Sequence, residues 1–112
     1  MPPVGSKTTS YTINSLEITV KDGMCVTKDG VLAGSALDMA TAVRNSVQKV
    51  GVPLDEALRM ASTYPAEAAG LGKELGRIEK GYRSNFVIFD NQVYVSAVVT
   101  EGKYLDFSNE EN

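Results

Sequence analysis

The sequence predicts an α+β chain in which strands come first, three helices follow, and strands return at the end. Near the N-terminus, apolar residues alternate with polar ones, which is typical of a strand with one buried face. In the middle of the chain they recur at spacings of three and four residues, which is typical of amphipathic helices. Close to the C-terminus a short continuous apolar run indicates a buried strand.

Composition limits the kind of protein this can be. With 112 residues, 43% of them hydrophobic, the chain fits one small domain or one piece of a larger one. The net charge of -3 and the pI near 4.9 give no broad positive field, so we expect no nucleic-acid partner and no membrane partner. Because no apolar run is long enough to cross a bilayer and no signal peptide is recognisable, we expect a cytoplasmic location.

Cysteine and histidine content narrows the possible chemistry. The chain has one cysteine, Cys25, and no histidine. An internal disulfide is therefore excluded, and hydrolytic sites of the Ser-His, Cys-His or zinc type cannot be assembled from this chain alone. We interpret Cys25 as a packing residue.

The first strands form a predicted hairpin. Residues 16–21 place Leu, Ile and Val on one face and polar side chains on the other. Asp22-Gly23 supplies the residue types of a tight turn, and residues 24–28 return as the second strand, which ends at Asp29-Gly30.

The first predicted helix spans residues 36–50. Ser35 is placed as its N-cap, Asp38 as an acidic variant of the capping box, and Gly51 as its stop. The apolar stripe consists of Leu37, Ala40, Val43, Val47 and Val50.

Two further helices follow directly. Residues 53–62 begin with a proline in the first turn, where its missing N–H is tolerated, and carry Leu54 and Leu58 on one side. Thr63 is the predicted cap of a short third helix that runs through Ala69 and ends at a glycine.

The last part of the chain returns to loop and strand. Residues 71–84 are rich in glycine and charge and read as a loop, with a short bridge at Arg77-Ile78. We predict a strand at 86–90 that is buried on both faces, a turn at Asn91-Gln92 and a second strand at 93–102 that ends in a glycine turn. Residues 108–112 are a polar tail.

Three motifs carry a family resemblance. They are LAGSALDM followed by AVRN (residues 32–45), GVPLDEALRMAS with YPA (51–66), and the glycine pattern LGRIEKG (75–81). Together they resemble the C-terminal part of the N-acetylglucosamine-6-phosphate deacetylase family, in the amidohydrolase superfamily, over roughly Met1 to Tyr104. The third motif is shared widely in the superfamily and does not identify the substrate. The chain departs from the usual pattern only after Gly81, where Ser84-Asn85-Phe86 replaces an Ala-Asp-Leu type of sequence.

The resemblance implies a fold and a domain division. Residues 1–70 would be the end of a TIM-type barrel domain, including an active-site loop, the hairpin and the last helices. Residues 71–112 would supply C-terminal strands of the small β-sandwich domain of an amidohydrolase, followed by the tail.

The resemblance also implies a substrate-binding segment at Leu32, Ala33 and Gly34. Small residues there would let the backbone pack against a sugar and its N-acetyl methyl group. Residue chemistry alone favours a simpler interpretation, in which Leu32 is a core residue and Ala33 to Ser35 lead into the helix. The resemblance favours the pocket.

The catalytic parts of the family lie upstream of the matched region. Members use a divalent metal ion, and an aspartate transfers a proton from the metal-bound water to the departing amine. We therefore predict no catalytic and no metal-binding residue in this chain, and we interpret Met1-Pro2-Pro3 as the remnant of a catalytic loop. Asp22, Asp29 and Asp38 are explained by turns and capping.

The implied whole-enzyme reaction is hydrolysis of the N-acetyl group of N-acetylglucosamine 6-phosphate in amino-sugar catabolism. The chain alone is predicted to be inactive and to associate with the remainder of the barrel or with copies of itself as a homo-oligomer. The alternative is a stand-alone, non-catalytic protein-binding module derived from the same family.

Overall fold

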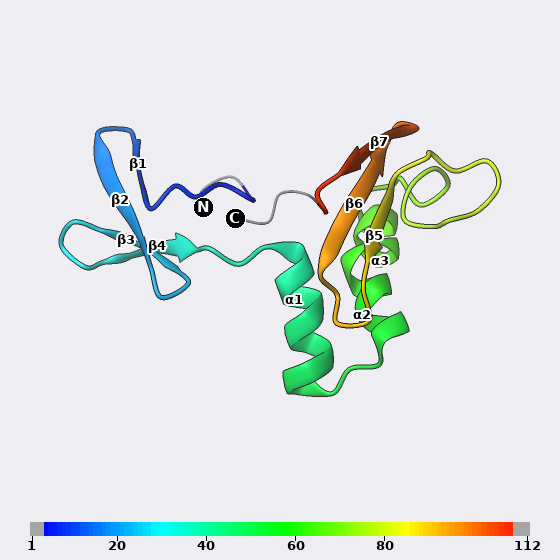
Figure 1. Ribbon diagram of the computed structural model, residues 1–112, viewed down its shortest axis with the longest axis horizontal. Helices are drawn as coiled ribbons and strands as arrows, with labels where there is room; N and C mark the ends of the chain where they lie inside the picture. The colour runs from blue at the N-terminus through cyan, green and yellow to red at the C-terminus, as the bar shows by residue number, and fades with distance from the viewer. Residues whose placement is uncertain (1–3, 109–112) are drawn as a thin grey trace. The chain divides into compact units, whose positions relative to one another are not determined.

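The computed structural model describes residues 4–108, so the predictions for Met1-Pro2-Pro3 and for residues 109–112 of the tail lie outside the described part. The chain divides into two compact units, Met1–Asp38 and Met39–Asn112. Strands build the first unit, and helices followed by strands build the second, as Figure 1 shows. The predicted α+β class is confirmed.

The N-terminal unit is a four-stranded antiparallel sheet. Its strands are β1 (Ser10–Ile13), β2 (Leu16–Lys21), β3 (Met24–Thr27) and β4 (Leu32–Ser35), in the order β1-β2-β3-β4. The predicted hairpin of β2 and β3 is confirmed. Asp22 and Gly23 both have positive φ, at 51° and 74°, which suits a two-residue hairpin turn that follows the twist of the strands.

Two strands of this sheet were not predicted. The β1–β2 turn is Asn14-Ser15, whose φ values of 50° and 67° are also positive although neither residue is glycine. The second missed strand is β4, since we expected Leu32–Ser35 to be a loop. Four small or apolar residues show no alternation, but pairing with β3 satisfies their backbone in the ladder.

The first helix starts later than predicted. It is α1 (Met39–Asn45), and it continues as a π-helical turn, η1 (Ser46–Val50). Ser35 is not its N-cap, because this residue belongs to β4 and its Oγ accepts a hydrogen bond from the Leu37 amide at 3.0 Å. The predicted stop is confirmed: Gly51 has a left-handed φ of 84°, and its N–H donates to the Ser46 carbonyl.

The next two helices agree with prediction except for one cap. They are α2 (Leu54–Ala61), preceded by Pro53, and α3 (Thr63–Ala68). Thr63 is the first helical residue rather than the cap. Its buried hydroxyl donates to the Gly76 carbonyl at 2.6 Å and thereby fastens the following loop to α3.

The core of the C-terminal unit joins helices to the segment between the last strands. Val43 of α1, Ala57 of α2 and Val93 form a buried cluster. Half-buried apolar residues pack around it, namely Val47, Val52, Leu58, Ala61 and Phe89. The helical stripe predicted from the sequence therefore has a partner for Val43 and Val47, whereas Leu37 and Leu54 are 46% and 40% exposed.

Residues 71–84 form the predicted loop, but the bridge at Arg77-Ile78 is absent from it and Ile78 is 84% exposed. The loop is held by side chains instead of a ladder. The Tyr82 hydroxyl donates to the Gly72 carbonyl at 2.7 Å, and Arg83 forms an ion pair with Glu101 at 2.6 Å.

The second sheet has three antiparallel strands in the order β5-β6-β7. These are β5 (Phe86–Phe89), β6 (Val95–Thr100) and β7 (Lys103–Asp106). The turn at Asn91-Gln92 is confirmed. The strand predicted at 93–102 is confirmed as β6, which begins at Val95, and its closing glycine turn is confirmed at Glu101-Gly102, where both φ values are positive. The strand β7 that follows was not predicted.

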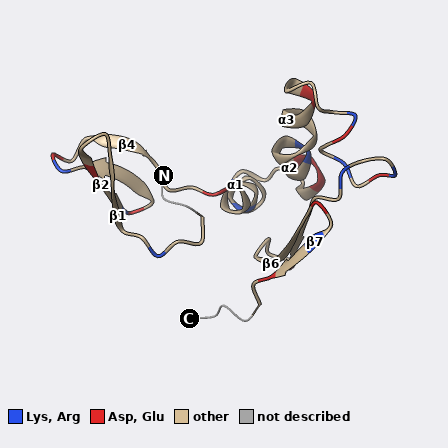
Figure 2. Cartoon of the chain, turned by 90° about the horizontal axis from the view of Figure 1, so that it is seen from above, with Lys and Arg blue, Asp and Glu red and all other residues tan. Residues whose placement is uncertain are grey.

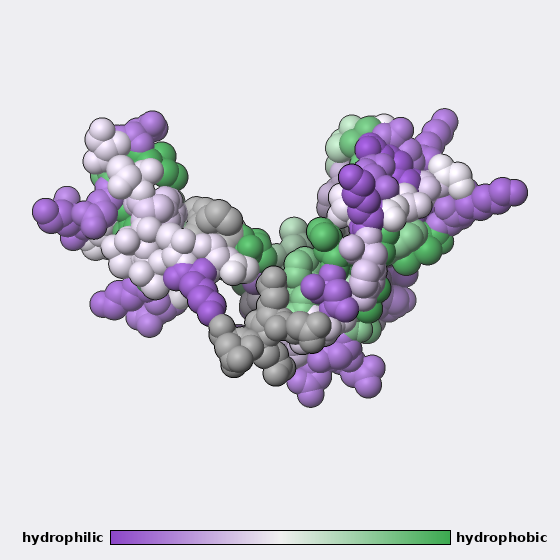
Figure 3. Space-filling model, turned by 45° about the horizontal axis from the view of Figure 1, so that its top comes forward, coloured by the Kyte–Doolittle hydropathy of each residue, from purple (hydrophilic) through white to green (hydrophobic). Residues whose placement is uncertain are grey.

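The prediction that 86–90 is buried on both faces is also wrong. Val87 and Ile88 of β5 are 55% and 44% exposed. The reason is the position of β5 at an edge of a three-stranded sheet, which leaves its side chains partly uncovered by the described residues. Figure 3 shows hydrophobic side chains, in green, that reach the surface of both units.

We predict that Gly76→Ala destabilises the C-terminal unit. The φ of Gly76 is +91°, and an added Cβ would lie 2.9 Å from both the Ala66 Cβ and the Thr63 Cα. We expect a loss of about 1–3 kcal/mol in the free energy of unfolding, measured by urea denaturation of the purified chain. The matched control is Gly34→Ala, where an added Cβ meets nothing within 4 Å and φ is not positive. Equal stability of the two variants would contradict the steric argument.

Candidate functional site

The predicted substrate-binding residues all lie on β4, an edge strand of the N-terminal sheet. Leu32 is 65% exposed, Ala33 is exposed and Gly34 is half-buried. The interpretation of Leu32 as a core residue is therefore wrong within the described chain. An exposed leucine on an edge strand is available for contact with a further group.

A β-bulge shapes this segment. Met24 pairs with Ser35 and Cys25 with Gly34, but Val26 pairs with Leu32, so Ala33 is an extra residue on β4. Directly opposed residues of an antiparallel pair share a face of the sheet. Leu32 thus lies on the face of Val26 and Gly34 on the face of Cys25, although residues two apart in a regular strand would share one face.

The face of Gly34 is the better packed one. Ile18 and Cys25 are buried there, at 5% and 1% exposure, and the half-buried Tyr11 pairs with Ile18 across the β1–β2 ladder. Hydrogen bonding with the Cys25 side chain, and to a smaller extent burial, raises the pKa of Tyr11 above its ordinary value.

Gly34 itself is not required by the fold of the described chain. Its φ is not in the left-handed region, and a Cβ built at this position would have no heavy atom within 4 Å. Glycine at a site without backbone strain and without a steric neighbour leaves open space over the strand. A flat ligand group could approach the backbone closely at this point.

The sequence did not reveal Tyr11 and Cys25 as neighbours of this segment. The only signal was the pattern in residues 10–13, where Tyr11 and Ile13 alternate with polar residues over a stretch too short to predict a strand. Asp22 lies in the β2–β3 turn and Asp29 in the turn after β3, as expected, and Asp38 directly precedes α1.

A second cluster of charged residues lies on α2 and α3. Arg59 pairs with Glu56 at 2.8 Å and with Asp55 at 3.1 Å, and the Tyr64 hydroxyl donates to Glu56 at 2.8 Å. These contacts lower the pKa of Glu56, chiefly through Tyr64, and that of Asp55, chiefly through Arg59. Because the members are largely exposed, the Arg59 pairs lie three and four residues apart on α2, and Tyr64 links α3 to α2, we interpret the cluster as stabilisation of these two helices.

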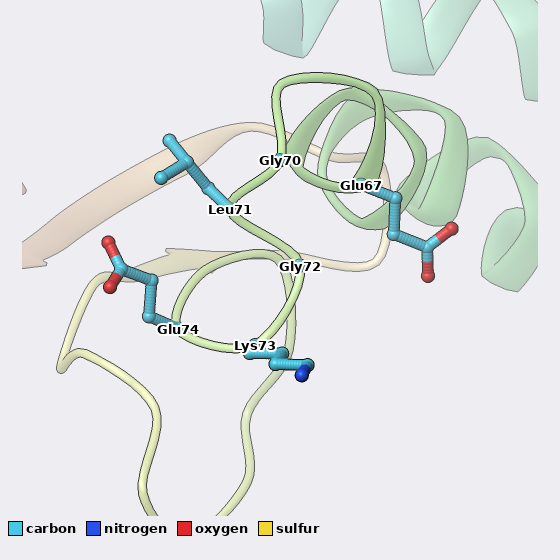
Figure 4. A pocket seen from close by; sticks show the side chains of 6 residues that line it. All are labelled: Glu67, Gly70, Leu71, Gly72, Lys73 and Glu74. Atoms are coloured by element: carbon cyan, nitrogen blue, oxygen red, sulfur yellow. The ribbon is translucent and has the colours of Figure 1, made fainter.

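Two surface depressions are the remaining candidate sites. One is lined by Glu67 and by residues 70–74, and Figure 4 shows Glu67 and Lys73 on one side of this turn, with Leu71 and Glu74 on the other. Glu67 there pairs with Arg77 at 3.6 Å. The other depression covers the opposite face of the β2–β3 hairpin, around Thr19 and Met24.

Residues 4–108 contain neither a metal-binding cluster nor a membrane-spanning helix. In that range no group of three or more His, Cys, Asp or Glu side chains is placed to hold a metal ion. The residues present do not fit a divalent metal, so no chemical step through one is assigned to them. Within the same range, no helix combines the length and apolarity needed to span a bilayer. Figure 2 shows basic and acidic residues interspersed in both units.

Several known proteins are similar to this chain in sequence. Residues 7–107 match the model of the Amidohydrolase family. An N-acetylglucosamine-6-phosphate deacetylase of Haemophilus influenzae is 36% identical over 95 residues, which are 85% of this chain and 25% of that protein. A putative N-acetylgalactosamine-6-phosphate deacetylase of Escherichia coli K12 is 35% identical over 107 residues, which are 96% of this chain and 64% of that protein.

Solved structures agree with the sequence comparisons. The crystal structure of an N-acetylglucosamine-6-phosphate deacetylase from Pasteurella multocida matches with a TM-score of 0.79 and 39% identity over 87% of this chain. The matched part is 26% of that structure's chain. The chain therefore spans about a quarter of the length of these deacetylases from Haemophilus and Pasteurella.

Proposed function

Because this chain belongs to the amidohydrolase family, we propose that it is the C-terminal portion of an N-acetylglucosamine-6-phosphate deacetylase. The similarity to such deacetylases over 85–87% of the chain carries the proposal. The whole enzyme would hydrolyse the N-acetyl group of the sugar phosphate to give glucosamine 6-phosphate and acetate. A cytoplasmic location remains a prediction.

The proposed role of this chain is substrate contact. Leu32, Ala33 and Gly34 would line the sugar pocket, and the open space over Gly34 supports close approach of the ligand to the backbone. The divalent metal and the proton-transferring aspartate would come from the rest of the enzyme. The 1–70 segment would complete a TIM-type barrel, and residues 71–112 would join a β-sandwich domain.

The second candidate is a stand-alone, non-catalytic protein-binding module of the same family. The partly exposed apolar side chains of Val87 and Leu105, 55% and 53% exposed, favour it. Detection of the endogenous protein by an antibody against this chain separates the two: a single much longer polypeptide supports the deacetylase, and a 12 kDa product supports the module.

We predict that the purified 112-residue chain has no deacetylase activity, with or without added zinc, cobalt or manganese. The described residues offer neither a metal cluster nor an imidazole base. The measurement is acetate release from N-acetylglucosamine 6-phosphate against a heat-inactivated sample. Metal-dependent turnover above that control would overturn the assignment of catalysis to the rest of the enzyme.

We predict that Gly34→Val raises the Michaelis constant of the complete deacetylase by about tenfold, equivalent to ~1.4 kcal/mol. The branched side chain would fill space that the fold leaves open but the sugar would need. Steady-state kinetics on N-acetylglucosamine 6-phosphate provide the measurement, and circular dichroism checks the fold. Unchanged kinetics in a well-folded variant would remove this segment from the pocket.

We predict that the isolated chain associates rather than remaining a monomer. Val87 and Leu105 lie opposite Val98 from the two sides, so they form one apolar row across β5, β6 and β7. Both edges of this sheet carry strands without a further partner among residues 4–108, and such edges pair readily with other strands. Sedimentation equilibrium at micromolar concentration is the test. A 12 kDa species with cooperative unfolding would favour the module.

A further inference from the structure

The position of residues 32–34 depends on their neighbours on β3, and their role in binding substrate rests on the proposed function. Cys25 lies on β3 between two strands, opposite Val20 of β2 on one side and Gly34 of β4 on the other. It is 1% exposed and has the largest fully buried side chain of the described residues. Gly34 contributes no side chain to this cross-strand pair, so packing between the two positions depends on Cys25.

The bulge begins at this pair. The register is regular from Met24 to Cys25 and shifts between Cys25 and Val26, where Ala33 becomes the extra residue. Cys25 therefore occupies the last regular position before the two strands change register. A one-residue change of register sends side chains to the other face, so the bulge beside Cys25 sets the faces that Leu32 and Gly34 occupy.

Tyr11 is a second neighbour of Cys25, on the opposite edge strand of the sheet. It is on β1, two strands away from β3, and it lies on the same face of the sheet as Cys25, whose side chain is the main cause of its raised pKa. Ile18 lies beside them on the same face and is 5% exposed. The cysteine is thus held by β1 and β2 while its other neighbour, Gly34, borders open space.

We propose that Cys25 is a positioning residue: it fixes the bulge at Ala33 and so sets how residues 32–34 are presented to the sugar. Its action on substrate passes through β4, and the thiol itself does not touch the ligand.

The test uses the complete deacetylase with three variants. Cys25→Ala removes the side-chain contact and should raise the Michaelis constant about three- to tenfold, with kcat changed by about twofold or less. Cys25→Ser restores size and hydrogen bonding to Tyr11 and should return the Michaelis constant to within about twofold of the unaltered enzyme. Thr63→Val is the matched control, because it removes the hydrogen bond to Gly76 in the other unit. It should lower the melting temperature without changing the Michaelis constant.

A second readout follows the register directly. In the 112-residue chain, the backbone amide shifts of residues 32–35 in nitrogen-15 spectra should move in Cys25→Ala, and their hydrogen exchange should accelerate. In Thr63→Val the same amides should stay unchanged.

The outcomes are distinguishable. An unchanged Michaelis constant in Cys25→Ala, or an equal rise in Thr63→Val, overturns the positioning role of Cys25. The Gly34→Val variant tests the proposed function independently of that result. Unmoved amides at residues 32–35 overturn it as well. If the unaltered enzyme turns over neither N-acetylglucosamine 6-phosphate nor the galactosamine epimer, the proposed function fails first and takes the positioning of substrate with it.

Discussion

The C-terminal unit depends on the unusual backbone of Val93. Its φ is +65°, a left-handed value that a β-branched side chain rarely adopts, yet its side chain is 6% exposed and belongs to the core. Neighbouring interactions hold it there. Arg44 donates to the carbonyls of Val93 and Gln92 at 2.6 and 3.1 Å and stacks on the Tyr94 ring at 3.9 Å. Without this geometry the helices would lose their buried contact with the segment that leads into β6.

The turn at residues 90–94, which contains Val93, is also held by a carboxylate. The Asp90 side chain accepts hydrogen bonds from the amides of Gln92 and Tyr94, both at 2.9 Å, and these bonds hold its pKa below the ordinary value. Backbone donors and a charged acceptor thus define the turn, while Arg44 defines its position against α1. A positive φ at a valine is tolerated here because polar contacts on both sides and burial of the side chain offset its cost.

The predictability of each element follows from how strongly its own residues specify it. Periodicity over eight or more residues located α2, and Asp22-Gly23 located the β2–β3 hairpin. By contrast, β4 was missed because Leu32–Ser35 has neither alternation nor β-branched residues, and β3 supplies its order through pairing. The family motif indicated the segment of the candidate site, but the face that each residue occupies depends on a bulge, which is a property of two strands together.

Two glycines show why the candidate site needs the structure as well as the motif. Gly76 is required by the fold, because its φ is positive and Ala66 and Thr63 occupy the space of a side chain. Gly34 is subject to neither constraint. A glycine that the fold does not demand carries its own cost, since its backbone loses more entropy on folding than that of other residues. The proposed approach of a ligand to the β4 backbone would account for a glycine at this position. The motifs single out neither glycine over the other, and only the space around them separates Gly76, which the fold requires, from Gly34, which it does not.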